Sequence, residues 1–287
     1  MQGDCTIQAE RLPIPELDAR LFGARRLSAL TDEELFAHTG VRIAFTGRAG
    51  GVSEGPFSAL NLGGHVGDDA QAVARNRTLL LEAMDAAHAP LVMANQVHGD
   101  RIVEVRASDA PSLEAARSLA LAGADALVVE VPQVAALLCF ADCVPVIVVS
   151  PTGRFAVVHA GWRGAVAGVA GKAVQQLAER DEPSLGIEAA AAYNAYIGPH
   201  IHAGCFETGP DVRAQFVERF GPAVAPDGHH VDLARAVASD LEAAGLHAQR
   251  IVDAGVCTAC HPDAYFSYRA TGGTCGRHGA FAVLQKG

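Results

Sequence analysis

Residues 124–160 form a dense block of apolar segments that limits the folds open to this chain. The segments ADALVVEV, VAALLCFA, PVIVVS and RFAVVHA follow one another with only short turns such as SPTG between them. Short apolar runs bounded by turn residues are typical of buried strands. A sheet made of such strands has to be covered by other elements. The block therefore predicts a buried sheet inside a layered domain.

Further elements are expected on both sides of this block. Apolar residues at helical spacing predict helices over residues 69–87, 164–180, 210–220 and 231–244. Additional strands are expected over residues 41–46, 91–97, 101–105 and 192–198, and again after residue 250. Residues 91–97 and 101–105 are expected to pair around a His-Gly-Asp turn, and residues 107–122 to form a surface excursion. Because helices and strands mix without strict βαβ alternation, a layered α/β or α+β fold is favoured.

The composition excludes several classes of protein. Half of the 287 residues are apolar and only 19% are charged, so the chain can bury a sizeable core and is not disordered. A net charge of −10 argues against binding along a nucleic-acid backbone, and 6% aromatic residues against a base-stacking surface. The most apolar stretch, LLCFADCVPVIVV, is interrupted by Asp142 and Pro145 and is too short to cross a bilayer. No nucleic-acid or membrane partner is expected.

Domain organisation and location follow from the same survey. No linker composition interrupts the chain, so we expect a single domain over residues 1–287, with residues 1–40 as an N-terminal extension. Seven cysteines at irregular spacing are not typical of a disulfide framework, and the N-terminus has no apolar signal-peptide core. We expect a cytoplasmic protein that is a monomer or a small homo-oligomer.

Three potential metal ligands stand at the ends of predicted strands. His98 lies in NQVHGD, Cys143 in FADCVP and His159 in VVHAGWRG, at separations of 45 and 16 residues, so a common site has to assemble in three dimensions. A single histidine or cysteine is usually an ordinary core or surface residue, but each of these sits where an apolar run meets glycine, proline or a charge. Two imidazoles and one thiolate suit Zn²⁺ and leave a fourth position open for water or substrate.

Two arginines beside glycines are candidate anion ligands. Arg48 begins the RAGG loop and Arg163 lies in GWRG. A guanidinium beside exposed backbone N–H groups is suited to a phosphate or a carboxylate. The RAGG loop is neither a Walker P-loop nor a dinucleotide fingerprint, and a glycine loop after a strand is often only a turn.

The other cysteine and histidine motifs carry weaker signals. Cys257 and Cys260 form one C-x-x-C motif, which we interpret as structural because no second motif and no thioredoxin-like start accompany it. His200 and His202 form a lone H-x-H pair, which is not enough for a multicopper oxidase site. The H-x-E and P-C-x-x-C pattern of cytidine deaminases is absent.

Taken together, these motifs resemble the YfiH family, also labelled laccase-domain or polyphenol oxidase proteins and described as purine nucleoside phosphorylases. The resemblance runs from about residue 42 to the C-terminus. Its blocks are RAGGVSEGPFSALNLGGHVGDD, ANQVHGDRIVEV, GADALVV, ADCVPVIVV, AVVHAGWRG, YIGPHIHAGCFETGPDV, and the late CTAC, YFSYR and GR. The combination of ADCVP, HAGWRG and NQVHG is highly specific.

The resemblance implies a site and an activity. It implies a zinc site with His98, Cys143 and His159 as ligands, with Cys143 and His159 also catalytic, in an α/β/β/α sandwich similar to toxin-like cysteine hydrolases. It implies phosphorolysis of adenosine, inosine and methylthioadenosine to the base and ribose 1-phosphate, and deamination of adenosine. We expect Arg48 to act in catalysis, and phosphate or substrate to contact Arg48, Asn61 and Arg163.

Three alternatives remain open at this point. Copper binding and phenol oxidation are also associated with the family, so the chain could be a copper-dependent polyphenol oxidase. It could be a cysteine hydrolase or an editing factor for peptidoglycan precursors, with Cys143 as nucleophile and His159 as base. It could also be a scaffold protein with structural zinc, although such sites normally have four ligands.

The chain departs from the family pattern at His200, at Phe206 and in SYRA, where SYRR is usual.

Overall fold

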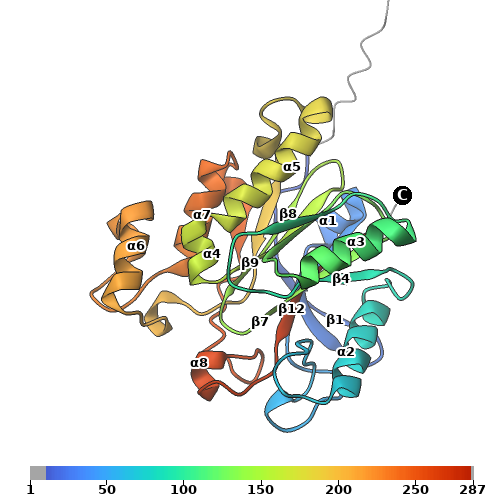
Figure 1. Cartoon of the computed structure of the whole chain (residues 1–287), viewed down its shortest axis with the longest axis horizontal. Coiled ribbons are helices and arrows are strands. Elements are labelled where there is room, and N and C mark those ends of the chain that lie inside the picture. Colours follow the sequence, from blue (N-terminus) through green and yellow to red (C-terminus); the bar gives the residue numbers. More distant parts are fainter. Residues whose placement is uncertain (1–10, 286–287) are drawn as a thin grey trace, which may run out of the picture.

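Side chains alternate between two buried faces along strand β7 (Ala135–Phe140). Ala135 and Leu137 pack in one hydrophobic core, and Ala136 and Leu138 pack in another. A strand that is buried on both faces has to lie between two other layers. The computed structural model, which describes residues 11–285, shows that this strand belongs to one of two sheets packed face to face (Figure 1).

Each sheet has six strands. The first has the order β1 (Asp18–Phe22), β2 (Leu27–Thr31), β3 (Val41–Thr46), β12 (His278–Leu284), β7 and β4 (Leu91–Met93). The second has the order β11 (Ile251–Asp253), β10 (Asn194–Ile197), β8 (Val144–Val149), β9 (Phe155–Ala160), β6 (Ala126–Val129) and β5 (Ile102–Val105). β4 runs parallel to β7, β5 to β6 and β10 to β11, and the remaining pairs are antiparallel.

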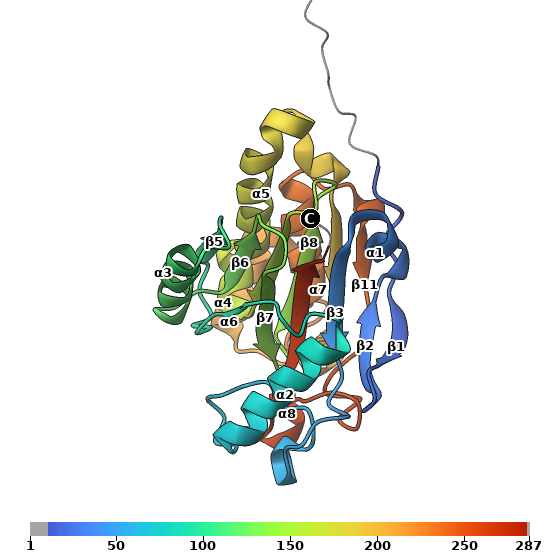
Figure 2. The ribbon, with the colours of Figure 1, turned by 90° about the vertical axis from the view of Figure 1, so that its right-hand side faces the viewer.

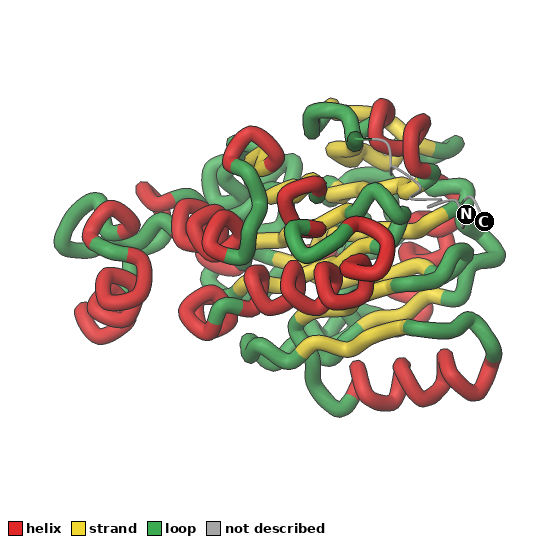
Figure 3. The backbone as a smooth tube through the Cα atoms, turned by 90° about the horizontal axis from the view of Figure 1, so that it is seen from above, coloured by secondary structure: helices red, strands yellow, loops and turns green. Residues whose placement is uncertain are grey.

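Helices cover the outer faces of both sheets. The α-helices of the described residues are α1 (Glu33–Thr39), α2 (Ala70–Ala83), α3 (Ala110–Leu121), α4 (Trp162–Ala167), α5 (Val169–Leu185), α6 (Pro210–Phe220), α7 (Leu233–Ala243) and α8 (Tyr268–Thr271). Helices α4 to α7 pack on the second sheet and α2 packs on the first, so that strands lie between helices when the molecule is seen from above (Figure 3). The predicted α/β/β/α sandwich is confirmed.

The predicted N-terminal extension contributes to this sandwich. Residues 18–39 form β1, β2 and α1, and β2 pairs with β3. Asp32 caps α1 by accepting a hydrogen bond from the backbone N–H of Leu35, and its other oxygen accepts one from the Tyr196 hydroxyl of the second sheet. Residues 1–10 and 286–287 of the predicted single domain lie outside the described residues. No helix between residues 11 and 285 combines the length and apolar character needed to cross a membrane.

Three local predictions are wrong. Residues 91–97 and 101–105 do not pair, because β4 joins β7 in the first sheet while β5 joins β6 in the second. Residues 107–122 contain helix α3, which Asp109 caps and whose Leu113, Ala116 and Ala120 enter the core between the sheets. The helix expected over 164–180 is broken into α4 and α5 at Gly168, where φ is 79°.

Candidate metal centre and cavity

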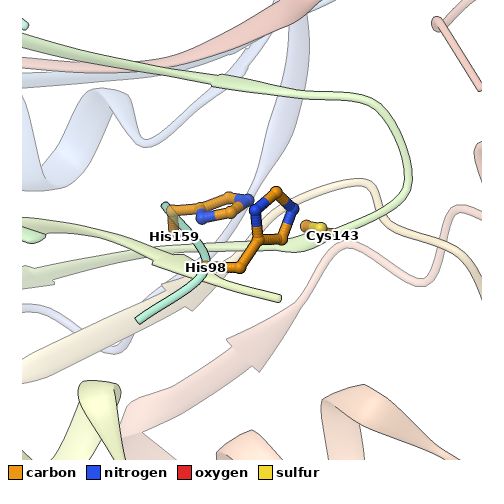
Figure 4. Close-up of side chains that lie close together, drawn as sticks. All are labelled: His98, Cys143 and His159. Atoms are coloured by element: carbon orange, nitrogen blue, oxygen red, sulfur yellow. The ribbon is translucent and has the colours of Figure 1, made fainter. Parts of the chain in front are cut away.

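His98, Cys143 and His159 meet in one place (Figure 4). His159 lies on β9, Cys143 on the turn from β7 to β8, and His98 on the loop from β4 to β5. The three potential ligand atoms all lie within 4.8 Å of one another. The two imidazole rings meet edge to face with their centroids 4.9 Å apart. Three residues that are distant in sequence and were expected to form a metal site are therefore adjacent in space.

The backbone around this triad allows the three side chains to pack close together. His98 has a φ of 61° and Asp142, beside Cys143, has a φ of 87°, both in a region that non-glycine residues seldom occupy. Gly161 leaves room for the triad, because a Cβ there would lie 2.7 Å from Cδ2 of His98 and 3.4 Å from Sγ of Cys143. The glycine of the HAGWRG motif thus provides the space that the His98 ring fills.

Asp125 holds two members of the triad in place. Its fully buried carboxylate lies 2.8 Å from Nδ1 of His159 and accepts hydrogen bonds from the backbone N–H groups of His98 and Gly99, at 2.9 and 2.7 Å. A carboxylate on Nδ1 leaves Nε2 of His159 to bind a metal, as is usual for metal-binding histidines. The sequence analysis missed Asp125. It could have been noticed as the acidic residue near the start of the apolar run ADALVV.

The charges at the triad suit a cation. Burial acts to raise the pKa of the Cys143 thiol, but the imidazoles of His159 and His98 outweigh it and lower that pKa to about 6. Burial acts to lower the pKa of His159, but Cys143 and Asp125 raise it to about 9. Without a metal, Cys143 and His159 therefore form a thiolate–imidazolium pair at neutral pH, and a metal ion that binds both displaces the proton of His159. This donor set of two imidazoles and one thiolate fits Zn²⁺.

A cavity of about 750 Å³ opens onto the triad. This volume is within the range of pockets that bind small molecules. Three arginines from separate segments line it, namely Arg77, Arg269 and Arg277. Arg77 belongs to α2 and Arg269 to α8, two helices that both lie towards the lower end of the molecule in Figure 2. Guanidinium groups beside a candidate metal site suit an anionic ligand.

Two of these arginines flank a glycine loop in the cavity wall. A Cβ on Gly63 would lie 2.7 Å from Cγ of Arg277, and one on Gly64 would lie 3.2 Å from Nη2 of Arg77. Arg77 donates hydrogen bonds from Nε and Nη2 to the carbonyl oxygen of Leu62, at 3.0 and 2.8 Å. Side chains at these two glycines would crowd the arginines, so the small residues allow both arginine side chains to pack against the loop.

Arg48 takes a different position from the one expected for a phosphate ligand. It is not among the described residues that line this cavity or a smaller neighbouring cavity. Its Nε donates a hydrogen bond to the carbonyl oxygen of Ser58 and its Nη1 to that of Pro262, at 2.8 and 2.6 Å, and the guanidinium lies over the Phe266 ring. Burial also lowers the pKa of Arg48. The side chain therefore ties two distant loops together.

Asn61 and Arg163, the other expected contacts, also lie outside the lining of the larger cavity. Asn61 is fully buried, and its Oδ1 accepts hydrogen bonds from the backbone N–H groups of Gly63 and Arg277. Arg163 lies over the Trp162 ring and lines a neighbouring cavity of about 220 Å³. Asn61 thus shapes the glycine loop from behind, whereas Arg163 approaches the triad from another side.

Two known crystal structures share this fold over at least 90% of the chain. The crystal structure of YlmD from Geobacillus stearothermophilus matches with a TM-score of 0.78 and 30% identity, covering 93% of this chain and 100% of that one. The crystal structure of YfiH from Bacillus licheniformis matches with a TM-score of 0.77 and 31% identity, covering 90% and 96%. The fold thus defines a protein of the YlmD and YfiH class.

Sequence comparisons specify the family. Purine nucleoside phosphorylase YlmD of Geobacillus stearothermophilus is 35% identical over 254 residues, which is 84% of this chain and 89% of the relative. Purine nucleoside phosphorylase PA4543 of Pseudomonas aeruginosa is 34% identical over 253 residues, 85% and 94% of the two chains. The model of the multi-copper polyphenol oxidoreductase laccase family matches residues 42–285. The chain belongs to this laccase-like YfiH family, as the resemblance implied.

Proposed function

We propose that this chain is a purine nucleoside phosphorylase with a zinc ion held by His98, Cys143 and His159. The observation that carries the proposal is the convergence of these three donors on a cavity that three arginines line. The names of the relatives supply the reaction class, and the donor set supports zinc. When bound, zinc supplies a Lewis acid beside the substrate.

The proposed substrates are adenosine, inosine and methylthioadenosine together with inorganic phosphate. In phosphorolysis, a phosphate oxygen bonds to the anomeric carbon of the sugar while the bond from that carbon to the purine nitrogen breaks. The purine leaves with the bonding electrons and takes up a proton, giving the base and the sugar 1-phosphate. The protein has to hold an anion against the sugar, exclude water and orient the base.

The lining of the cavity supports two of its arginines as the proposed phosphate contacts. Arg77 and Arg277 line the cavity and flank the Gly63–Gly64 loop, whereas Arg48 is not among the described residues that line it. We therefore transfer the expected phosphate contact from Arg48 to this pair and regard Asn61 as a positioning residue behind it. Arg163, in the adjoining cavity, is the proposed contact for a part of the substrate that extends past the triad.

Adenosine deamination is the second proposed activity of the same site. Water adds at C6 of the adenine ring and ammonia leaves, so that inosine forms. The chain's own residues place the ring next to the triad and keep Cys143 as a thiolate ligand. Both activities require the same bound ion in the proposal, so removal of the metal abolishes both.

One observation favours a second candidate function, a cysteine hydrolase. The Asp125 carboxylate lies 2.8 Å from the His159 imidazole. His159 in turn contacts the thiol of Cys143 and lowers its pKa to about 6. A base that is oriented by a third group and activates a thiol is the arrangement of cysteine nucleophiles. His98 argues for the metal enzyme, since such a triad has no use for a second imidazole.

Metal content and a product assay test the proposal together. Protein purified without added metal is analysed for zinc and copper, then incubated with each nucleoside in the presence and absence of phosphate. We expect zinc at the triad and phosphate-dependent release of base and sugar 1-phosphate, both lost in Cys143→Ala and retained in Gly228→Ala, where an added Cβ meets nothing within 4 Å. Copper with phenol oxidation, or activity that is indifferent to phosphate, would reject the assignment.

A further inference from the structure

A second group of metal-binding side chains lies outside the triad. Cys205, Cys257 and Cys260 place their sulfur atoms within 4.8 Å of one another, and the sulfurs of Cys205 and Cys260 are 3.5 Å apart. All three are free thiols. The sequence analysis interpreted Cys257 and Cys260 as structural, but the third cysteine, which comes from the turn before α6, could not be assigned to them from spacing.

The backbone beside Cys257 is arranged to support a negative charge on its sulfur. The backbone N–H of His202 donates a hydrogen bond to Sγ of Cys257 at 3.4 Å. Cys257 is buried, Cys205 is half-buried and Cys260 is exposed, so one side of the group opens to solvent. Three adjacent thiolates repel one another unless a cation lies between them. The group therefore has ligands, a supporting hydrogen bond and an entry path.

We propose that Cys205, Cys257 and Cys260 form a second metal site that binds a thiophilic divalent ion, with Zn²⁺ the ion that this donor set suits best. Thiolates are the ligands that zinc and other soft metals prefer. Each thiol loses its proton as it binds, and the exposed Cys260 leaves the site open to solvent. The three residues are separate from His98, Cys143 and His159, so occupancy does not depend on the proposed reaction.

The second site supports the first through Asp142, the residue before Cys143. Thr258, within the C-x-x-C loop, donates a hydrogen bond from Oγ1 to Oδ1 of Asp142 at 2.7 Å. Arg269 donates from its backbone N–H to Oδ2 of Asp142 and from Nη1 to the carbonyl oxygen of Cys205, at 2.7 and 2.9 Å. An ion that fixes the three cysteines therefore also fixes the partners of Asp142, whose backbone carries the left-handed turn that presents Cys143.

The experiment measures zinc binding and Co²⁺ spectra on the full chain. Wild-type protein is stripped, reduced, reloaded with Zn²⁺ alone and analysed for metal per chain, next to Cys260→Ser, His98→Ala and Cys275→Ser. We expect two ions in the wild type and in Cys275→Ser, and one ion in each of the other variants. In the Co²⁺ forms, His98→Ala keeps the strong sulfur-to-cobalt absorption of three thiolates, and Cys260→Ser keeps the weaker absorption of one.

Two results would overturn the second site. The first is a single ion in the wild type that Cys260→Ser retains in full. The second is the absence of bound metal at the three cysteines together with a Cys205–Cys260 disulfide in the unreduced protein, detected by mass spectrometry, which would make the group a redox pair. Because Cys260 is exposed, Cys260→Ser is expected to fold, and its circular dichroism and melting temperature establish this before the metal count.

Discussion

Asp125 binds His159 twice. Its carboxylate lies 2.8 Å from Nδ1 of the imidazole, and its carbonyl oxygen accepts a hydrogen bond from the backbone N–H of His159 at 2.7 Å. His159 lies on β9, and Asp125 immediately precedes the neighbouring strand β6, in which Ala126 is paired with Val158. The orientation of this imidazole is therefore set by strand pairing. The loops that carry His98 and Cys143 place their side chains next to it.

Asp125→Asn is expected to weaken zinc binding by about 10–100-fold, because the outer-shell partner of a metal-binding histidine sets its orientation and basicity. The side chain keeps its size but loses the charge that supports His159. Affinity is measured by competition with a chromophoric chelator. Asp100→Asn, which alters only an exposed ion pair with Lys172, is the matched control and should bind as the wild type does. Equal affinities for the two variants would contradict the role assigned to Asp125.

Gly161→Ala is expected to abolish zinc binding at the triad. The added Cβ would lie 2.7 Å from Cδ2 of His98, so the ring has to move away from the other two ligands. Gly228→Ala serves as control, since a Cβ there meets nothing within 4 Å. Zinc content and melting temperature are measured for both. Full zinc occupancy in Gly161→Ala would show that His98 is not needed as a ligand.

Alkylation of Cys143 distinguishes the metal enzyme from the cysteine hydrolase. A thiolate bound to zinc resists alkylation, whereas the stripped protein should react with iodoacetamide along a pH profile with its midpoint near 6, set by the pKa of Cys143. Labelling at this residue is followed by peptide mass spectrometry before and after chelation. Rapid labelling of the untreated protein, with activity unaffected by chelator, would establish the hydrolase instead.

Arg277→Gln and Arg77→Gln are each expected to raise the KM for phosphate by about tenfold or more, the loss typical of a charged hydrogen bond. Arg48→Gln should lower the melting temperature, because it removes the bonds to Ser58 and Pro262, and leave the KM for phosphate unchanged. Steady-state phosphorolysis and thermal unfolding separate the two effects. A rise in that KM confined to Arg48→Gln would return the phosphate to the RAGG loop.

His278 is expected to make the folded protein less stable in acid. Burial lowers its pKa to about 3, whereas the unfolded chain has a pKa of about 6.5. Between these values the unfolded chain binds a proton that the folded chain does not, so the free energy of unfolding falls as the pH falls, by about 1.4 kcal/mol per pH unit. Urea unfolding from pH 7 to pH 4 should show a smaller fall for His278→Phe. Parallel curves for the two proteins would contradict the assignment.

The sequence predicted the parts of the fold that repeat a pattern. Apolar runs and the polar residues that interrupt them are local signals. They therefore predict the buried strands of residues 124–160 and single out the three triad residues at the ends of predicted strands. The pairing of β4 and β5 with different sheets is not local, and the loop around His98 looks like a hairpin turn until both partner strands are known. Arg77 has no distinguishing neighbours on its helix, so only the packing of α2 shows that it reaches the cavity.

Strand β12 lies between β3 and β7 in the first sheet, although it is the last strand of the described chain to be synthesised. All six strands of the second sheet precede it, so that sheet can form while the first still has a gap at its centre. Until β12 arrives, β3 and β7 expose unpaired edges, which are the surfaces through which incomplete chains aggregate. Arg277 immediately precedes β12 and joins the cavity wall only at that stage. During translation, the cavity wall and the first sheet are therefore completed together, after the strands of the second sheet.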